Sequence, residues 1–131
     1  MQSKASGSFD VKLNPESLSG VAEPTGIGRM SLDKRFQGDL DAVSQGEMLA
    51  FRSGVQGSAG YVAMEKVSGT LHGRSGSFVL QHSSTMVRGT PAQSISVVPD
   101  SATGELAGLS GSMVIIIADG THSYEFDYVL P

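Results

Sequence analysis

Alternation of apolar and polar residues with a period of two runs through most of this chain, and it constrains the fold more than any other feature. Phe9, Val11 and Leu13, for example, are separated by polar residues, as in a strand that buries one face. No window of about a dozen residues has the period of 3.6 that marks an amphipathic helix. Two glycines oppose anything longer than a helical turn within residues 103–109. The chain is therefore predicted to be all-β.

The alternating runs predict eight strands. They cover residues 9–13, 30–36, 40–51, 61–71, 77–87, 94–98, 113–118 and 122–130. Strands mostly joined by short hairpins fit either a closed barrel or a sandwich. Long consecutive hairpins favour a meandering antiparallel barrel, because closure removes exposed edges. The length of 131 residues fits one barrel domain over residues 1–131. An eight-stranded barrel is just wide enough to be filled by side chains or to hold one small ligand.

Composition and charge exclude several classes of protein. A net charge of −4 argues against a nucleic-acid partner, which favours a basic surface. No apolar run approaches the roughly 18 residues of a membrane-spanning helix. Because the chain has no cysteine, it has no disulfide, thiolate metal site or cysteine nucleophile. Residues 1–10 are polar and mixed, which predicts no signal peptide and makes the cytoplasm the expected location.

Asp119-Gly120, between two alternating runs, is the strongest hairpin signal, since a type I′ turn needs positive φ at both central residues. Pairing across this turn puts Ile115 opposite Tyr124. The face with the larger apolar residues is predicted to point inward, and it carries Met113, Ile115, Ile117, Tyr124, Phe126 and Tyr128. The carboxylates of Glu125 and Asp127 then point outward.

A second hairpin is predicted around residues 73–76, which pairs Leu71 with Phe78 and sets the candidate site. Four polar residues share the inward face of this ribbon with large apolar residues, namely Tyr61, Glu65, His82 and Arg88. Glu65 and His82 are diagonal neighbours, close enough for their side chains to meet. A few convergent polar groups in apolar surroundings are typical of a small-molecule site. A slip of one residue in register would separate this pair.

The third strand changes its apolar phase. Its first apolar residues, Leu40 and Ala42, occupy even positions. The later ones occupy odd positions, namely Val43, Leu49 and Phe51. Gly46 lies between the two phases, which predicts a β-bulge that shifts the inward set by one residue. Such a bulge would turn Glu47 inward as a further ligand-binding candidate. An exposed Glu47 is an equally good interpretation.

Each candidate also has a purely structural interpretation. Glu65 and His82 could form an exposed cross-strand ion pair, worth less than about 1 kcal/mol. Tyr61 beside Arg88 is more often a contact at the rim of a barrel. The two other histidines lie next to turns, where solvent reaches them, so no three-ligand metal site and no cofactor are expected. The glycine-containing segments lack the strand–turn–helix context of phosphate-binding and nucleotide-binding loops.

Five segments have sequences typical of one protein family. They are residues 46–48 (GEM), 57–65 (GSAGYVAME), 69–73 (GTLHG), 76–82 (GSFVLQH) and 99–106 (PDSATGEL). Through them nearly the whole chain resembles a family of small bacterial proteins known as a domain of unknown function, grouped with the allene oxide cyclase-like, calycin-type barrels. Ser84 and Ala102 stand where glycine is common in that family. The resemblance implies an eight-stranded barrel and a small hydrophobic ligand, but no cyclase activity and no catalytic residues.

Three functions are consistent with the sequence. In the favoured one, the barrel interior binds a small, largely apolar molecule whose polar end meets Glu65, His82, Tyr61 and Arg88. In the second, the protein is an isomerase or cyclase in which His82 transfers a proton and Glu65 orients it. In the third, the barrel is solid and an outer apolar patch of Val114, Ile116 and Val129 forms a homo-oligomer.

Overall fold

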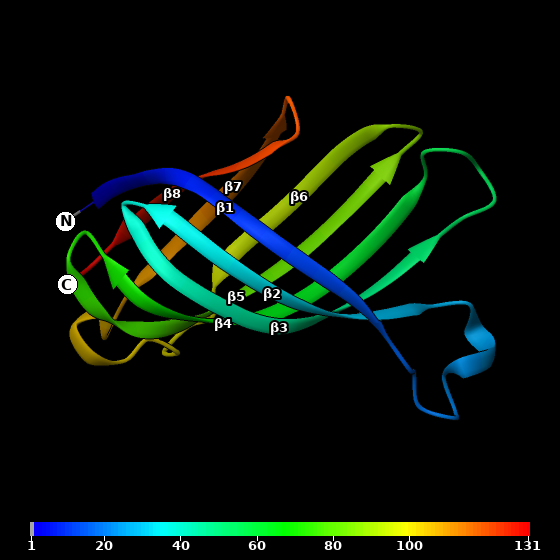
Figure 1. The fold of residues 1–131 in the computed structure, drawn as a ribbon, viewed down its shortest axis with the longest axis horizontal. Coiled ribbons are helices and arrows are strands. Elements are labelled where there is room, and N and C mark those ends of the chain that lie inside the picture. The colour runs from blue at the N-terminus through cyan, green and yellow to red at the C-terminus, as the bar shows by residue number, and fades with distance from the viewer. Residues whose placement is uncertain (1) are drawn as a thin grey trace.

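The computed structural model describes residues 2–131 and forms a closed barrel of eight antiparallel strands in simple sequence order (Figure 1). The strands are β1 (Gln2–Glu16), β2 (Gly28–Gly38), β3 (Leu40–Arg52), β4 (Ala59–Leu71), β5 (Arg74–Val87), β6 (Thr90–Val97), β7 (Ser110–Ala118) and β8 (Thr121–Val129). Two short 3-10 turns are the only helical elements of these residues, η1 (Glu23–Thr25) and η2 (Gly104–Leu106). The predicted all-β meander and the helical turn within residues 103–109 are confirmed.

The meander places successive connections at alternate ends of the barrel. One end, here called the capped end, carries both termini, the β2–β3 and β4–β5 turns and the long β6–β7 connection (Figure 1). The other end, here called the mouth, carries the β1–β2 and β3–β4 loops and the β5–β6 and β7–β8 turns. No helix of residues 2–131 has the length and apolar character that spanning a membrane requires.

The β7–β8 hairpin follows the sequence-based prediction residue by residue. Asp119 and Gly120 have φ of 53° and 75°, as a type I′ turn demands. Ile115 pairs with Tyr124, and the three aromatic residues of the predicted inward face are buried. Glu125 and Asp127 point outward, where both approach Lys4. Only Ile117 departs from the prediction, because it lies at the mouth and is 68% exposed.

The predicted register of the β4–β5 hairpin is wrong by four residues. The turn is His72-Gly73, with φ of 47° and 79°, and Leu71 pairs with Arg74 instead of Phe78. Gly76 is required for close approach to the β6–β7 connection, since a Cβ there would lie 2.1 Å from the Thr103 carbonyl oxygen. A shift of four residues is even and preserves the faces, so the residues predicted to point inward still do.

The predicted bulge in β3 is also wrong. The ladders from β3 to both neighbours run through Gly46 without an inserted residue. A Cβ on Gly46 would lie 2.0 Å from the carbonyl oxygen of Met64, so glycine here allows a close approach of two strongly coiled strands. The even positions of β3 point inward throughout. The odd apolar residues are therefore on the outer surface and 42–49% exposed, namely Val43, Leu49 and Phe51.

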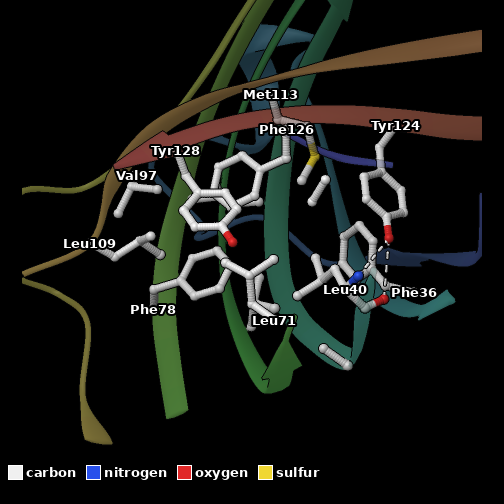
Figure 2. Close-up of a cluster of buried hydrophobic side chains, with 14 of the residues drawn as sticks. Phe36, Leu40, Leu71, Phe78, Val97, Leu109, Met113, Tyr124, Phe126 and Tyr128 are labelled. Carbon is white, nitrogen blue, oxygen red and sulfur yellow. Dashed lines mark hydrogen bonds between the residues drawn. The ribbon is translucent and has the colours of Figure 1, made fainter. Parts of the chain in front are cut away.

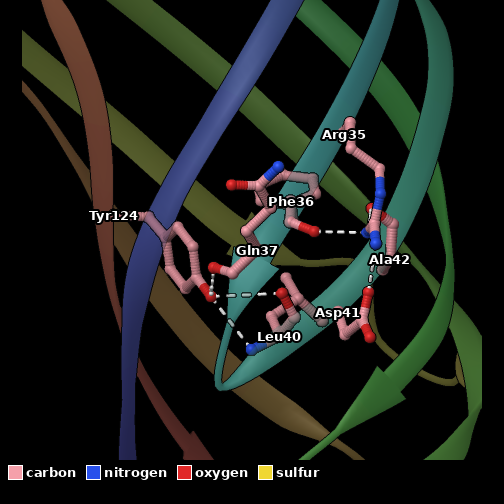
Figure 3. Close-up of polar contacts among 7 residues, drawn as sticks. All are labelled: Arg35, Phe36, Gln37, Leu40, Asp41, Ala42 and Tyr124. Atoms are coloured by element: carbon pink, nitrogen blue, oxygen red, sulfur yellow. Dashed lines mark hydrogen bonds and ion pairs between the residues drawn. The ribbon is translucent and has the colours of Figure 1, made fainter.

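The hydrophobic core fills the capped half of the barrel (Figure 2). Phe78 and Phe126 stack with ring centroids 5.8 Å apart. Leu106 and Leu109 of the β6–β7 connection are buried in the same core. The Tyr124 hydroxyl donates to the Gln37 carbonyl at 2.8 Å and accepts the Leu40 N–H at 2.9 Å, so β8 is fixed to the β2–β3 turn (Figure 3).

The β6–β7 contact is the weakest junction of the barrel. These strands share only two backbone pairs, Ile95 with Met113 and Ser96 with Ser112. Towards the mouth, the Gln93 side chain replaces the ladder: its amide nitrogen donates to the Ile115 carbonyl, and its amide oxygen accepts the Ile115 N–H at 2.9 Å. The barrel is therefore closed by a side-chain amide where the two backbones separate.

Candidate functional site

Four polar side chains meet inside the barrel between the core and the mouth, and together they form what we call the inner polar cluster. The carboxylate of Glu65 on β4 is its centre. Glu65 Oε2 accepts a hydrogen bond from Lys34 Nζ of β2 at 2.9 Å, and Oε1 accepts one from Ser44 Oγ of β3 at 2.8 Å. His82 Nε2 of β5 lies 2.7 Å from Oε2. All four residues are buried, so the contact predicted between Glu65 and His82 is confirmed and the exposed ion pair is excluded.

Lys34 and Ser44 were not identified from the sequence, although the alternation contains a signal for both. Lys34 has the even parity of Leu32 and Phe36 on β2 and therefore faces inward. A lysine between such residues is ordinarily assigned to the surface. Ser44 was hidden by the incorrect bulge, which removed the even positions beyond Ala42 from the predicted interior.

The surroundings of Glu65 stabilise its ionised form. Burial alone would raise the pKa of this carboxyl, but the close contact with His82 and the charge and hydrogen bond of Lys34 outweigh it and lower the pKa to about 2. The Lys34 ammonium also lies 5.0 Å and 5.8 Å from the ring centroids of Phe9 and Phe36, within the range of cation–π attraction. The cluster therefore contains a buried, ionised Lys34–Glu65 pair.

His82 is the one incompletely satisfied member of the cluster. Its Nε2 atom is buried and close to Glu65, yet among residues 2–131 it has no partner in the direction that a ring N–H donates. Buried donors without an acceptor cost about 1–3 kcal/mol. In folded proteins such groups are explained by local strain, by a functional role, or by a bound water or ion.

An apolar cleft adjoins the cluster on the mouth side of the barrel. It has a volume of about 360 Å³, and its inward-facing wall is formed by Met48, Ala50, Ala59, Tyr61, Ser84 and Met86. Ser84 follows His82 as the next inward residue of β5. Partial burial, with the nearby charge of Glu65, raises the pKa of Tyr61, so its phenol remains a neutral donor at physiological pH.

The two remaining candidate residues lie away from this cleft. Arg88 forms the β5–β6 turn with Gly89, has a φ of 46° and is exposed, so Tyr61 pairs with Ser84 instead. Glu47 points outward, where Arg29 donates two hydrogen bonds to it at 2.8 Å and 2.6 Å. The interior arrangement thus brings together Tyr61, Glu65 and His82.

Comparison with known proteins identifies the family of the chain. Residues 5–128 match the family model described as "Protein of unknown function (DUF3224)". The chain belongs to the DUF3224 family. A crystal structure of a DUF3224 protein with unknown function from Shewanella oneidensis MR-1 is 50% identical, covers 100% of this chain and 98% of that chain, and has a TM-score of 0.93. No curated protein matches. The resemblance to a domain-of-unknown-function family is confirmed.

In the inner polar cluster of this DUF3224 barrel, Glu65 itself is poorly suited to act as a general base. A carboxylate whose pKa is about 2 is a weak base near neutral pH, where a general base works best with a pKa close to the ambient pH. Among residues 2–131, no group of three or more His, Asp or Glu side chains is arranged to hold a metal ion. The cluster offers buried donors around one fixed anion.

The DUF3224 barrel also carries two apolar hollows on its outer surface. One has a volume of about 1050 Å³ and the other about 750 Å³, and both are bordered by Leu49 and Val62. These hollows are larger than the inner cleft, and most of the residues that border them point outward. Of the inner polar cluster, only His82 borders one of these hollows, the larger one. The inner cleft is the better candidate for specific recognition because its wall is formed by inward-facing residues of β3, β4 and β5.

Proposed function

We propose that the protein binds a small, largely apolar molecule in the mouth of its barrel, with the polar end of the ligand directed at the inner polar cluster. The observation that carries this proposal is the burial of Lys34, Glu65 and His82 in the barrel interior on the core side of an apolar cleft, whose wall includes Ser84, the next inward residue after His82. Buried ionisable groups are expensive to maintain. Such groups next to a concave apolar surface are characteristic of binding sites.

The dimensions and chemistry of the cleft support this function. Its volume of about 360 Å³ falls within the range of small-molecule sites, about 300–1,000 Å³. Tyr61 and Ser84 provide hydroxyl groups along an otherwise apolar wall. We further propose that the barrel is of the allene oxide cyclase-like, calycin type, on the basis of its closed eight-stranded meander. This grouping concerns the fold and carries no activity.

A fluorescent probe tests the proposal. N-phenyl-1-naphthylamine is neutral and apolar, and its emission increases when it leaves water. We expect its emission to rise with the wild-type protein and to remain low with Ala50→Phe, because a phenyl group at this inward position fills the cleft. Leu49→Phe is the matched control, since Leu49 is the next residue of β3 and points to the outer surface.

The two variants distinguish the inner cleft from the outer hollows. Loss of binding in Leu49→Phe would place the probe in an outer hollow and overturn the proposal, whether or not Ala50→Phe also weakens binding. The reason is that Leu49 borders both hollows, whereas Ala50 borders only the smaller one. Absence of any emission change with the wild-type protein, at probe concentrations up to its solubility limit, would also reject it. Circular dichroism of both variants verifies that the barrel is intact.

A further inference from the structure

The inner polar cluster has more buried donors than acceptors. Both oxygens of Glu65 are already in use, Oε1 by Ser44 and Oε2 by Lys34 with His82 beside it. An ammonium group has three N–H donors, and Glu65 is the one acceptor that receives a hydrogen bond from Lys34 within residues 2–131. His82 Nε2 has no directed acceptor there. The cluster therefore lacks an acceptor-rich group.

Small residues lie between the buried cluster and the mouth on two strands. All four members of the cluster are buried. The inward positions between the cluster and the cleft are occupied on β3 and β4 by Gly46 and Ala63, the two smallest residues. Large side chains on these strands thus do not separate the donors from the apolar cleft.

From this donor excess we propose that the polar end of the ligand is a carboxylate, held by Lys34 and His82. The inference rests on the binding function proposed above and specifies the chemical class of the ligand. A carboxylate supplies two strong acceptor oxygens, and charge-assisted hydrogen bonds to it are about twice as strong as neutral ones. The apolar body of the ligand then lies against Met48, Tyr61 and Met86 in the cleft.

Three probes with one aromatic body test the inference. They are 2-naphthoate, 2-naphthalenemethanol and 2-naphthylmethylamine, which carry an anionic, a neutral and a cationic end group. Isothermal titration calorimetry at pH 7 is expected to show at least tenfold tighter binding of the naphthoate than of the alcohol, with the amine weakest.

Variants locate the effect at the cluster. His82→Gln and Lys34→Met are expected to remove the preference for the naphthoate while the alcohol keeps its affinity. Lys66→Met is the matched control, because Lys66 follows Glu65 on β4 but is exposed on the outer surface. It is expected to leave all three affinities unchanged. Loss of the preference in Lys66→Met would assign it to the overall charge of the protein and overturn the inference.

The outcomes separate this inference from the proposed function. If the three probes bind equally well, the barrel binds apolar molecules but does not recognise a carboxylate. If the amine binds most tightly, Glu65 decides the selectivity and the inference is wrong. If none of the probes binds, the proposed binding function fails, and the inference fails with it. His82→Gln tests the inference even if Lys34→Met does not fold.

Discussion

Replacing Lys34 by Met tests whether the buried carboxylate of Glu65 depends on its cationic partner. Met is similar in length to the lysine stem and fits between the rings of Phe9 and Phe36 with favourable sulfur–aromatic contacts. The substitution thus removes the charge and creates little cavity. Leaving a buried charge without its partner costs about 3–5 kcal/mol, a large part of the ~5–15 kcal/mol that stabilises a domain.

The pKa of Glu65 gives a second estimate of the same size. Lowering this pKa from 4.5 to about 2 corresponds to ~3 kcal/mol of preferential stabilisation of the ionised form. Because the folded-state pKa is the lower one, this contribution is present above pH 4.5 and is lost as pH falls towards 2. We expect urea denaturation at pH 7 to show a loss of about 3 kcal/mol or more for Lys34→Met.

The pH dependence and a double mutant provide the controls. Without Lys34, burial raises the pKa of Glu65, so the difference in unfolding free energy between wild type and variant is expected to shrink as pH falls from 7 to 3. Adding Glu65→Gln removes the unpaired charge and is expected to recover about 2 kcal/mol or more of the loss. A loss below ~1 kcal/mol in Lys34→Met, or strict additivity in the double mutant, would refute the reasoning.

Two further substitutions test the fold around the site. Gly46→Ala is expected to lower the free energy of unfolding by about 1–3 kcal/mol in urea denaturation, because the new methyl group meets the neighbouring backbone. Gly54→Ala is its control and should change stability little, since a methyl group there meets nothing within 4 Å. Equal losses in the two variants would contradict the packing argument. Tyr124→Phe is expected to lower the free energy of unfolding by about 1–3 kcal/mol, because the buried N–H of Leu40 loses its acceptor. Tyr61→Phe is its control, since the Tyr61 hydroxyl has no hydrogen-bond partner within residues 2–131. An unchanged denaturation midpoint in Tyr124→Phe would show that the hydroxyl does not fix the turn.

The inward and outward faces of most strands could be predicted from the alternation of apolar and polar residues alone. Period-two alternation is a local property, and burial of one face enforces it in any sheet. The Asp119-Gly120 turn could also be predicted, because the positive φ angles of a type I′ turn depend only on its two central residues. The predicted β4–β5 register is wrong by four residues, and an even shift keeps every residue on the same face of its strand. Glu65 and His82 therefore both point inward, as predicted, although the position of the turn was predicted incorrectly.

The roles of the glycines, in turns or at close approaches between strands, depend on contacts between segments that are distant in the chain. Gly76 faces the carbonyl oxygen of Thr103 and Gly46 that of Met64, and neither contact is visible in the local sequence. Glycine fits both a positive φ and a crowded strand crossing, so the residue type alone did not distinguish them. The composition of the inner polar cluster was decided in the same way. Lys34 is buried because its side chain points into the barrel, where it meets the carboxylate of Glu65, which extends inward from β4 and compensates its charge.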